Sequence, residues 1–456
     1  MKNLNERLKS QQVSSQESSS LNGYAITAVA VVDVEKGIVI PDQTVLITGD
    51  RIQAIGPCAE LATPKDSHLI DGKGLYLIPG LVDAHAHYFD PQVFGRVMIA
   101  KGVLLIREMA HPTEQVLAIR DALNRGEQLG PEMVATGWVL DGYPALIPPV
   151  SIAIKTPDEG REIVRQQAAA GVDEIKVYSR LDKDVFLAIV DEAQQHGLKP
   201  VGHVPESIYI VDAAAVGLKS SEHLFGFEKV IATLLGEPVN LQFAGMGASA
   251  PYWLRFGQAD RAELQKVLRQ IREYGMAVCP TVIVFKTGAN LKGILAGSVP
   301  MDEYISPLVR EIWKSTWSPA QSGDELAGQI WSNMARFVNE LNQAGVTLMV
   351  GTDLIFPGII PGYSVHEEMA IWQEAGIASA DVLRSATLVP ARFMGLDKRL
   401  GTIAEGKTAS MVLVKANPLD DIRNAEKIEG VFLRGRYFDR NDLDQLLEEA
   451  KRLARN

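Results

Sequence analysis

The chain has 456 residues, of which 46% are hydrophobic and 22% are charged, and its formal net charge is −11. This composition excludes a disordered or fibrous chain and allows a large core. The acidic balance argues against nucleic acid or an anionic membrane as partner, because both select basic surfaces. Cys58 and Cys279 are the only cysteines, so neither a disulfide framework nor a Cys-rich zinc site is expected.

The first residues, 1–22, are polar and rich in Ser, Gln and Lys, which predicts a disordered N-terminal segment. They contain no apolar core of a signal peptide. The longest apolar runs of the chain also fall far short of the roughly 20 residues that span a bilayer. We therefore expect a cytoplasmic protein.

Both ends of the chain carry short β-rich runs separated by Gly, Asp and Pro turns. These runs occupy residues 23–76 and return over residues 397–440. Two such flanks around one long middle predict a small discontinuous β-sandwich domain built from both chain ends. The last residues, 441–456, predict a C-terminal helix.

The middle of the chain, residues 77–396, alternates buried-strand runs with helical periodicity, as βαβ units do. The candidate strands are LIPGLVDA (77–84), GVLLIRE (102–108), EMVATG (132–137), DEIKVY (173–178), KPVGHV (199–204), KSSEHL (219–224), MAVCPT (276–281) and GVTLMVGTD (345–353). Eight strands with helices between them predict an α/β fold, a (β/α)8 TIM barrel. The excess length lies mainly in residues 225–344, where we expect pocket and lid insertions.

Polar side chains follow several of these strands, where a TIM barrel carries its chemistry. His85 and His87 close the first strand two positions apart, so both side chains point to the same side. The fourth, fifth, sixth and eighth strands end near Lys176, His203, His223 and Asp353. Singly, each histidine could be a core or loop residue and Asp353 a helix cap. Lys176 needs a function, because an unpaired ammonium in a buried strand is strongly penalised.

Four imidazoles, one carboxylate and one lysine suit two borderline divalent cations better than one. A lysine ammonium repels a cation, so Lys176 helps only when CO2 converts it to a carbamate that bridges both ions. Zinc is the first expectation, although cobalt, manganese or iron also accept such ligands.

Seven motifs resemble, in order, those of the amidohydrolase superfamily in its binuclear subtype with a carboxylated lysine. They are PGLVDAHAH (79–87), EIKVY (174–178), GHV (202–204), SSEHL (220–224), GTD (351–353), SATLVPARFMGL (385–396) and GTIAEGKTASMVLVKANPL (401–419), and the match covers roughly residues 24–438. The chain departs from the usual pattern at Ser410 and Met411, where an acidic residue is common. We expect this departure to affect stability at most.

The resemblance implies a complete ligand set. One cation is held by His85, His87 and Asp353, the other by His203 and His223, and carboxylated Lys176 and a hydroxide bridge them. Two cations lower the pKa of the bridging water, which then attacks a carbonyl near neutral pH. Asp353 then moves the proton to the leaving group.

A second tier of residues lies near these ligands. Tyr178, two residues beyond Lys176, either donates a hydrogen bond to the substrate carbonyl or packs at the rim. His366 either contacts substrate or orients the loop of Asp353. We also expect Arg107 to pair with Glu108. The remaining expectations place His111 in the pocket, His68 and His196 away from it, and Cys279 in the core.

Within the superfamily, the chain resembles the imidazolonepropionase-like and Xaa-Pro dipeptidase-like group, which includes phenylurea and molinate hydrolases. Residues 225–344 contain Trp253, Trp313, Trp317 and Trp331 but few clustered arginines. This favours hydrolysis of a hydrophobic amide, urea or carbamate over that of a dipeptide, whose carboxylate requires a cation. An Xaa-Pro or N-acyl dipeptidase is a close alternative, followed by a deaminase and a non-catalytic metal-binding barrel. The expected partners are a small-molecule substrate and further copies of the chain, not nucleic acid or membrane.

Overall fold

The computed structural model describes residues 23–237, 250–297, 299, 301–317 and 326–455. The segment predicted to be disordered, residues 1–22, lies outside the described residues, as do parts of the predicted insertions. Within the described ranges, no helix has both the length and the apolar character needed to cross a membrane.

Strands and helices alternate through the middle of the chain, and strands dominate both ends. The strands are β1 (Tyr24–Asp33), β2 (Ile38–Thr48), β3 (Arg51–Pro57), β4 (His68–Asp71), β5 (Tyr76–Pro79), β6 (Leu81–Ala86), β7 (Val103–Glu108), β8 (Glu132–Ala135), β9 (Val139–Asp141), β10 (Ser151–Ala153), β11 (Glu174–Val177), β12 (Lys199–Gly202), β13 (Ser220–Glu222), β14 (Ala277–Cys279), β15 (Met411–Val414), β16 (Ile428–Leu433) and β17 (Arg436–Phe438). The helices are α2 (Pro91–Ala100), α3 (Thr113–Asn124), α4 (Pro157–Ala170), α5 (Lys183–Gln195), α6 (Ile210–Val216), α7 (Phe227–Leu234), α8 (Ala250–Arg255), α9 (Arg261–Glu273), α10 (Val282–Gly288), α11 (Leu291–Leu295), α12 (Pro307–Thr316), α13 (Ala327–Gln343), α14 (Tyr363–Glu374), α15 (Ser379–Ser385), α16 (Leu388–Phe393) and α17 (Arg440–Ala454).

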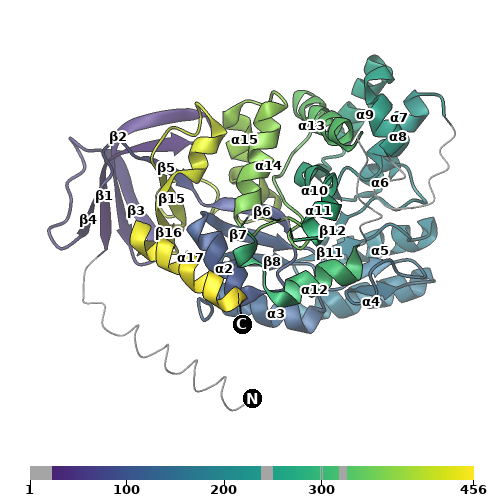
Figure 1. Ribbon diagram of the computed structural model, residues 1–456, viewed down its shortest axis with the longest axis horizontal. Helices are drawn as coiled ribbons and strands as arrows, with labels where there is room; N and C mark the ends of the chain where they lie inside the picture. Colours follow the sequence, from purple (N-terminus) through teal and green to yellow (C-terminus); the bar gives the residue numbers. More distant parts are fainter. Residues whose placement is uncertain (1–22, 238–249, 298, 300, 318–325, 456) are drawn as a thin grey trace, which may run out of the picture.

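One eight-stranded mixed sheet combines both ends of the chain, in the order β17-β16-β15-β5-β1-β2-β3 with β4 beside β1. Figure 1 shows the purple N-terminal strands next to the yellow C-terminal ones. The sheet also curls, because β3 bonds to the segment before β15. The Ile52 amide donates to the Lys407 carbonyl at 2.9 Å, and the Ala409 amide donates to the Asp50 carbonyl at 2.8 Å.

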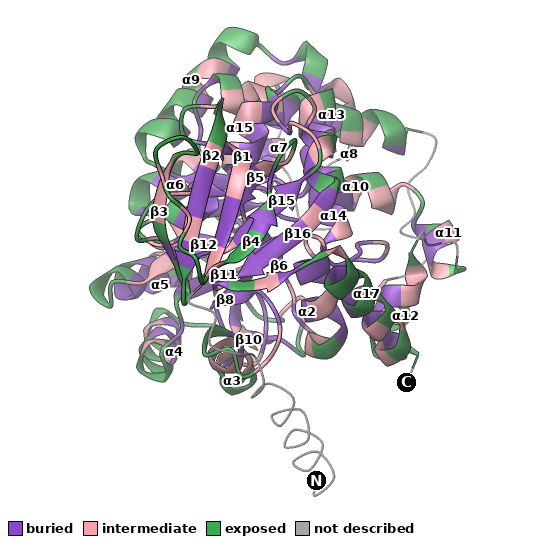
Figure 2. Ribbon diagram, turned by 90° about the vertical axis from the view of Figure 1, so that its left-hand side faces the viewer, coloured by how far each residue is buried: buried purple, intermediate pink, exposed green. Residues whose placement is uncertain are grey.

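The central strands of this sheet bury both faces. Leu77 and Met411 belong to a small core enclosed by the curled sheet, whereas their neighbours Ile78 and Val412 belong to the main core, shared with the barrel helices. Successive side chains of a strand point to opposite faces, so such alternation is expected of a sheet with two buried faces. The extent of burial is visible along the strands in Figure 2.

The remaining strands run parallel in two groups, β6-β7-β8 and β10-β9-β11-β12-β13-β14. Backbone hydrogen bonds connect the groups on both sides. The Asp173 amide donates to the Ala135 carbonyl at 2.9 Å, between β11 and β8. On the other side, residues 347–350 lie between β14 and β6: the Met349 amide donates to the Val278 carbonyl at 3.0 Å and the Ala84 amide to the Val350 carbonyl at 2.9 Å.

Two strand predictions require correction. The run predicted as one strand over 77–84 forms two, β5 in the mixed sheet and β6 in the parallel group, with Gly80 between them. A Cβ atom at Gly80 would lie 2.7 Å from Leu104 Cδ1. Glycine therefore fits the point where the chain passes from the mixed sheet to the parallel group. The segment predicted as a strand over 345–353 does not form one. It makes an isolated bridge at Leu348, and another isolated bridge lies just beyond the segment at Leu354.

The other six predicted barrel strands are present but shorter, and β9 and β10 were not predicted. Three-residue strands are too short to show a period in the sequence. The predicted C-terminal helix is α17, which lies along α2 (Figure 1) and is joined to it by an ion pair of 3.0 Å between Arg96 and Glu449.

Candidate metal centre

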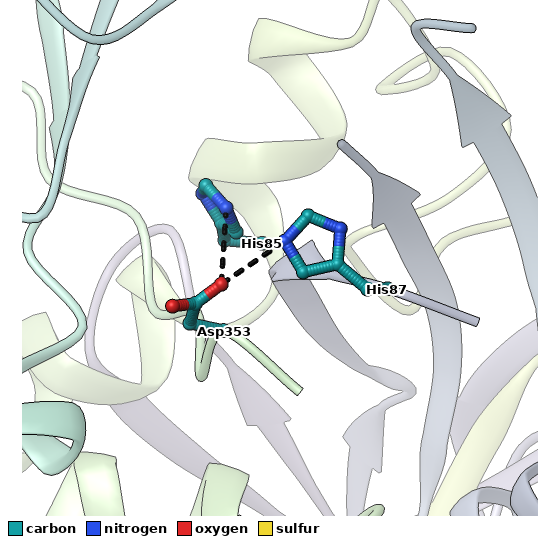
Figure 3. A group of neighbouring side chains, drawn as sticks. All are labelled: His85, His87 and Asp353. Carbon is teal, nitrogen blue, oxygen red and sulfur yellow. Dashed lines mark hydrogen bonds and ion pairs between the residues drawn. The ribbon is translucent and has the colours of Figure 1, made fainter. Parts of the chain in front are cut away.

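His85, His87 and Asp353 converge at the end of β6 (Figure 3). Asp353 Oδ1 lies 3.1 Å from His87 Nε2 and 3.5 Å from His85 Nε2. One ligand atom from each residue lies within 4.8 Å of the other two, close enough for all three to share one ion. Asp353 has a φ of 58°, a backbone conformation that a residue other than glycine adopts at some cost and that often marks a functional site.

A buried carboxylate next to this cluster holds β6 and the segment 351–353 side by side. Asp83 accepts hydrogen bonds from the Thr352 amide at 2.9 Å and from the Thr352 hydroxyl at 2.6 Å. The Asp353 amide donates to the His85 carbonyl at 2.8 Å. Next to them, a Cβ at Gly351 would lie 2.7 Å from the His85 amide nitrogen, so glycine permits the close approach.

The remaining predicted histidines complete the cluster. His203 follows β12 and His223 follows β13. The ring centroids of His85 and His223 are 4.4 Å apart, and those of His203 and His223 are 5.0 Å apart. The structure therefore brings together all four histidines that the sequence singled out.

Three of these imidazoles are held through one nitrogen by a buried partner. The Nδ1 atoms of His85, His203 and His223 bond to Glu222 Oε2 at 2.8 Å, Ser179 Oγ at 2.8 Å and Thr281 Oγ1 at 2.7 Å, respectively. The opposite nitrogen, Nε2, of His85 and of His203 is buried without a hydrogen-bond partner among the described residues. An imidazole fixed in this way offers its second nitrogen as a metal ligand, so the residues present fit divalent cations.

Three of the four imidazoles are neutral at pH 7, and the fourth, His87, is protonated. Burial lowers the pKa of His85 and His203 well below the usual range and that of His223 to about 4, which leaves neutral ligands at pH 7. Burial alone would lower the pKa of His87 too, but the hydrogen bond to Asp353 and the charges of Asp353 and Glu108 raise it to about 9, so a cation must displace a proton from His87. Burial opposes ionisation of Asp353, yet His223 and His87 hold the pKa of its carboxyl well below the usual range.

Lys176 on β11 lies among these groups with 1% of its surface exposed. Its Nζ atom lies 5.9 Å from the centroid of the Tyr178 ring, which stacks on His203, and its charge adds to burial in lowering the pKa of both His85 and His203. Burial lowers the pKa of Lys176 itself to about 8, although Glu222 and Asp353 oppose this shift. A larger share of the amine is therefore neutral near pH 7 than in an exposed lysine.

The second-tier residues lie in different places. Tyr178 stacks on His203 with ring centroids 3.8 Å apart, and burial raises the pKa of its phenol, which therefore keeps its proton. His366 on α14 instead points to the end of α2, with Nε2 2.9 Å from the Lys101 carbonyl oxygen. The structure does not bring His366 into the cluster of His85, His87 and Asp353.

The predicted pairing of Arg107 with Glu108 is wrong. Arg107 donates to Glu174 at 2.6 Å and to Glu222 at 3.1 Å, whereas Glu108 lies 3.8 Å from His87 Nδ1. Adjacent residues of a strand point to opposite faces, so these two side chains cannot meet. His111 does lie beside the cluster, 3.9 Å from Glu108, while His196 on the outer surface pairs with Glu192.

Sequence reasoning missed Glu222, Ser179 and Thr281, which hold the imidazoles, and Asp83, which holds Thr352 beside β6. A carboxylate in a buried strand requires a partner, and this could have signalled Glu222 within the motif SSEHL. The partners of Ser179 and Thr281 depend on register between strands, which sequence spacing does not give.

Comparison with known proteins assigns the family. The model of the family described as "Amidohydrolase family" matches residues 76–437. The chain therefore belongs to the amidohydrolase family and is a hydrolase that acts on carbon–nitrogen bonds.

Some individual relatives are distant but match over most of the chain. An imidazolonepropionase of Thermoanaerobacter pseudethanolicus is 23% identical over 408 residues, covering 85% of this chain and 87% of that protein. The solved structure of a bottromycin amidohydrolase has a TM-score of 0.74 at 23% identity, covering 96% of this chain and 91% of that one. That of a Xaa-Pro dipeptidase has a TM-score of 0.65 at 19% identity, covering 91% and 99%. These likenesses establish a TIM-barrel-like α/β fold with an additional domain.

Proposed function

We propose that the protein is a binuclear, metal-dependent hydrolase that cleaves a carbon–nitrogen bond of a hydrophobic amide, urea or carbamate. The observation that carries this proposal is the convergence of buried, unpartnered imidazole nitrogens with Asp353 and a buried lysine. His85, His87 and Asp353 would hold one cation, His203 and His223 the other, and Lys176, once carboxylated, would be a ligand to both. Zinc is the proposed metal, with cobalt, manganese and iron as alternatives. When bound, two such cations lower the pKa of a shared water enough to make it nucleophilic near neutral pH.

The side chains of the protein supply the remaining chemistry. The neutral Lys176 nitrogen attacks the carbon of CO2; a nitrogen–carbon bond forms, one carbon–oxygen π pair moves to oxygen, and the nitrogen passes a proton to water. The resulting carbamate carries one negative charge, which removes the penalty of an ammonium beside two cations. Asp353, ionised in the folded protein, accepts a proton from the attacking water and passes it to the leaving nitrogen. The phenol of Tyr178 donates a hydrogen bond to the substrate carbonyl.

Aromatic rings beside the cluster support a hydrophobic substrate. Phe225 lies 4.5 Å from His203 between ring centroids, on the imidazole that Tyr178 also contacts. Phe356, three residues beyond Asp353, contacts Trp317 with centroids 5.4 Å apart. Apolar and aromatic linings with few polar groups are typical of pockets for small organic ligands.

Two of the four tryptophans considered for the pocket belong to the core instead. Trp253 and Trp313 are 2% and 3% exposed, and Trp313 Nε1 donates to the Ile355 carbonyl at 2.7 Å. Trp317, partly buried against Phe356, is therefore the tryptophan that we propose for the pocket wall.

We also propose that the eight parallel positions close into a (β/α)8 barrel and that the curled mixed sheet forms a β-sandwich. The hydrogen bonds at Asp173 and Met349 support closure of the barrel, and those at Ile52 and Ala409 support the sandwich. The protein is further proposed to bind a small-molecule substrate and to form homo-oligomers.

The test is a hydrolysis panel with zinc-reconstituted protein, in which aryl ureas and thiocarbamates are compared with Xaa-Pro and N-acyl dipeptides. We expect turnover of the ureas or thiocarbamates by the wild type and none by Asp353→Asn, which keeps the size of the side chain but removes the proton acceptor. Turnover of dipeptides alone would make the protein a dipeptidase. Release of ammonia from a ring carbon would make it a deaminase, and a metal-loaded protein without any hydrolysis would contradict the proposal.

A further inference from the structure

The four imidazoles of the cluster are supported by two chemically different kinds of partner. Behind His85 and His87 lie carboxylates: Glu222 at 2.8 Å and Glu108 at 3.8 Å, each with 0% of its side chain exposed. Behind His203 and His223 lie the hydroxyls of Ser179 and Thr281. The division follows the two proposed metal positions, with carboxylates behind one and hydroxyls behind the other.

The carboxylate behind His85 is part of a buried charged network. Glu222 Oε1 accepts from Arg107 at 3.1 Å and from the Ser220 hydroxyl, which leaves Oε2 for the His85 ring. Arg107 also binds Glu174 at 2.6 Å, so one guanidinium faces two carboxylates and the network keeps a negative charge next to His85.

The carboxylate behind His87, Glu108, is not part of the Arg107 network. Its Oε2 atom is buried without a hydrogen-bond partner among the described residues. Its charge lies between His87 and His111.

These partners change how strongly an imidazole binds a cation. A carboxylate that accepts the Nδ1 proton makes the opposite nitrogen a more basic donor, and partners of this kind tune metal affinity. A neutral hydroxyl orients the ring but supplies no charge. Two buried negative charges behind the first position also attract a cation directly, since Coulomb interactions are stronger inside a protein than in water.

We infer that the two metal positions have unequal affinities, that the position formed by His85, His87 and Asp353 is filled first, and that Glu222 and Glu108 are the positioning residues that make it the tighter one. Ser179 and Thr281 are the positioning residues of the weaker position, formed by His203 and His223. This inference rests on the proposed two-metal function. It predicts that, when metal is scarce, each protein molecule holds one cation, and that the sample is not a mixture of empty and fully loaded molecules.

The test measures Zn²⁺ binding to metal-free full-length protein in bicarbonate buffer, by competition with a chromophoric chelator. We expect two steps in the wild type that differ by about 10-fold or more, the scale on which such partners act. Glu222→Gln and Glu108→Gln should weaken the first step about 10- to 100-fold and the second step less. Ser179→Ala and Thr281→Val should weaken the second step and leave the first unchanged.

Glu132→Gln is the matched control, because Glu132 is a buried carboxylate paired with a different arginine, Arg399, and no contact with an imidazole is found among the described residues. It should leave both steps unchanged. Unfolding of each metal-free variant, followed by circular dichroism, identifies any that do not fold; Glu108→Gln, which leaves the Arg107 network intact, then tests the carboxylates without Glu222.

The outcomes separate this inference from the function on which it rests. Two Zn²⁺ bound with equal affinity, or carboxylate variants that weaken both steps alike, overturn the unequal positions and leave the two-metal function standing. Fewer than two Zn²⁺ per chain at saturation overturns both.

Discussion

Lys176 has unfavourable surroundings as long as it remains an unmodified amine. Burial lowers its pKa to about 8, Glu222 and Asp353 oppose this shift, and Arg107 adds to it. Two bound cations would add further repulsion. Conversion to a carbamate reverses the sign of the charge and turns an unfavourable residue into a shared ligand.

Lys176→Ala should therefore lose bound metal and activity together. We expect at least one of two Zn²⁺ to be lost and kcat/KM to fall by about 100-fold or more, since even indirect partners of a metal change activity on that scale. Atomic emission gives the metal content and a hydrolysis assay the activity. Lys183→Ala, an exposed residue at the start of α5, is the control and should change neither. A Lys176→Ala protein with both ions and full activity would remove the bridging role.

At the scale of single residues, the sequence predicted the metal ligands better than the residues that orient them. His85, His203 and Asp353 could be found because each follows an apolar run that ends at one face of a barrel. Glu222 and Thr281 could not be assigned as partners, because a hydrogen bond between side chains from different strands depends on register and twist. Arg107 shows the limit clearly, since its partners Glu174 and Glu222 lie far along the chain and its neighbour Glu108 does not touch it.

At the scale of elements, the site depends on the seam between β6 and residues 347–353. The predicted eighth strand correctly places an extended segment beside β6, but the segment makes isolated bridges instead of a continuous ladder. The Asp353 backbone, with its positive φ, ends the extended conformation and turns the carboxylate toward both histidines. Hydrophobic patterning predicts an extended segment at residues 347–353. It does not predict that the Thr352 amide and hydroxyl bond to the Asp83 side chain.

Gly351→Ala should damage this seam more than the fold. The added Cβ would lie 2.5 Å from Cys279 Sγ and 2.7 Å from the His85 amide nitrogen, so β6 or the segment must shift and His85 with it. We expect Zn²⁺ affinity to fall about 10-fold or more, by the same sensitivity to ligand orientation, with a smaller loss of stability. The control is Gly328→Ala in α13, where a Cβ meets open space and alanine favours the helix by about 1 kcal/mol. Unchanged Zn²⁺ binding by Gly351→Ala would show that the seam does not set the ligand geometry.

The contact between α14 and α2 should make stability depend on pH. Burial lowers the pKa of His366 below its usual value of 6.5, although the bond to the Lys101 carbonyl opposes this shift. Below about pH 6.5 the unfolded chain therefore binds a proton that the folded protein does not, and stability falls as pH decreases. His366→Gln keeps a donor for the carbonyl and removes the titration, so its free energy of unfolding should vary less with pH between 5 and 7.

Urea unfolding of the metal-free protein at several pH values measures this dependence, with each pKa unit of difference worth about 1.4 kcal/mol. His196→Gln is the control variant, because the His196 side chain is 38% exposed and lies away from α2 and α14, and it should retain the wild-type slope. Equal slopes for wild type and His366→Gln would mean that His366 is not the titrating group.

At the scale of the whole molecule, the β-rich ends and the barrel share one core. The sequence predicted that both ends of the chain meet, because each end shows the same short alternating strands. It did not predict that one face of their common sheet joins the barrel core, since Leu77 and Ile78 are equally apolar and their alternation appears only as a continuous hydrophobic run. The same ambiguity led β5 and β6 to be predicted as one strand.

A shared core predicts that the two parts unfold together. Leu77→Ala removes a fully buried side chain from the small core enclosed by the curled sheet and should cost about 2–5 kcal/mol. All six tryptophans lie between residues 138 and 372, so tryptophan fluorescence reports on the barrel alone. If the parts unfold together, Leu77→Ala lowers the temperature of the fluorescence transition as much as that of the circular-dichroism transition. Leu69→Ala on β4, where the side chain is 62% exposed, should shift neither. A fluorescence transition that stays at the wild-type temperature while the strands unfold earlier would show that the barrel is stable without the sheet, and that the apolar face around Ile78 contributes little to holding the two parts as one unit.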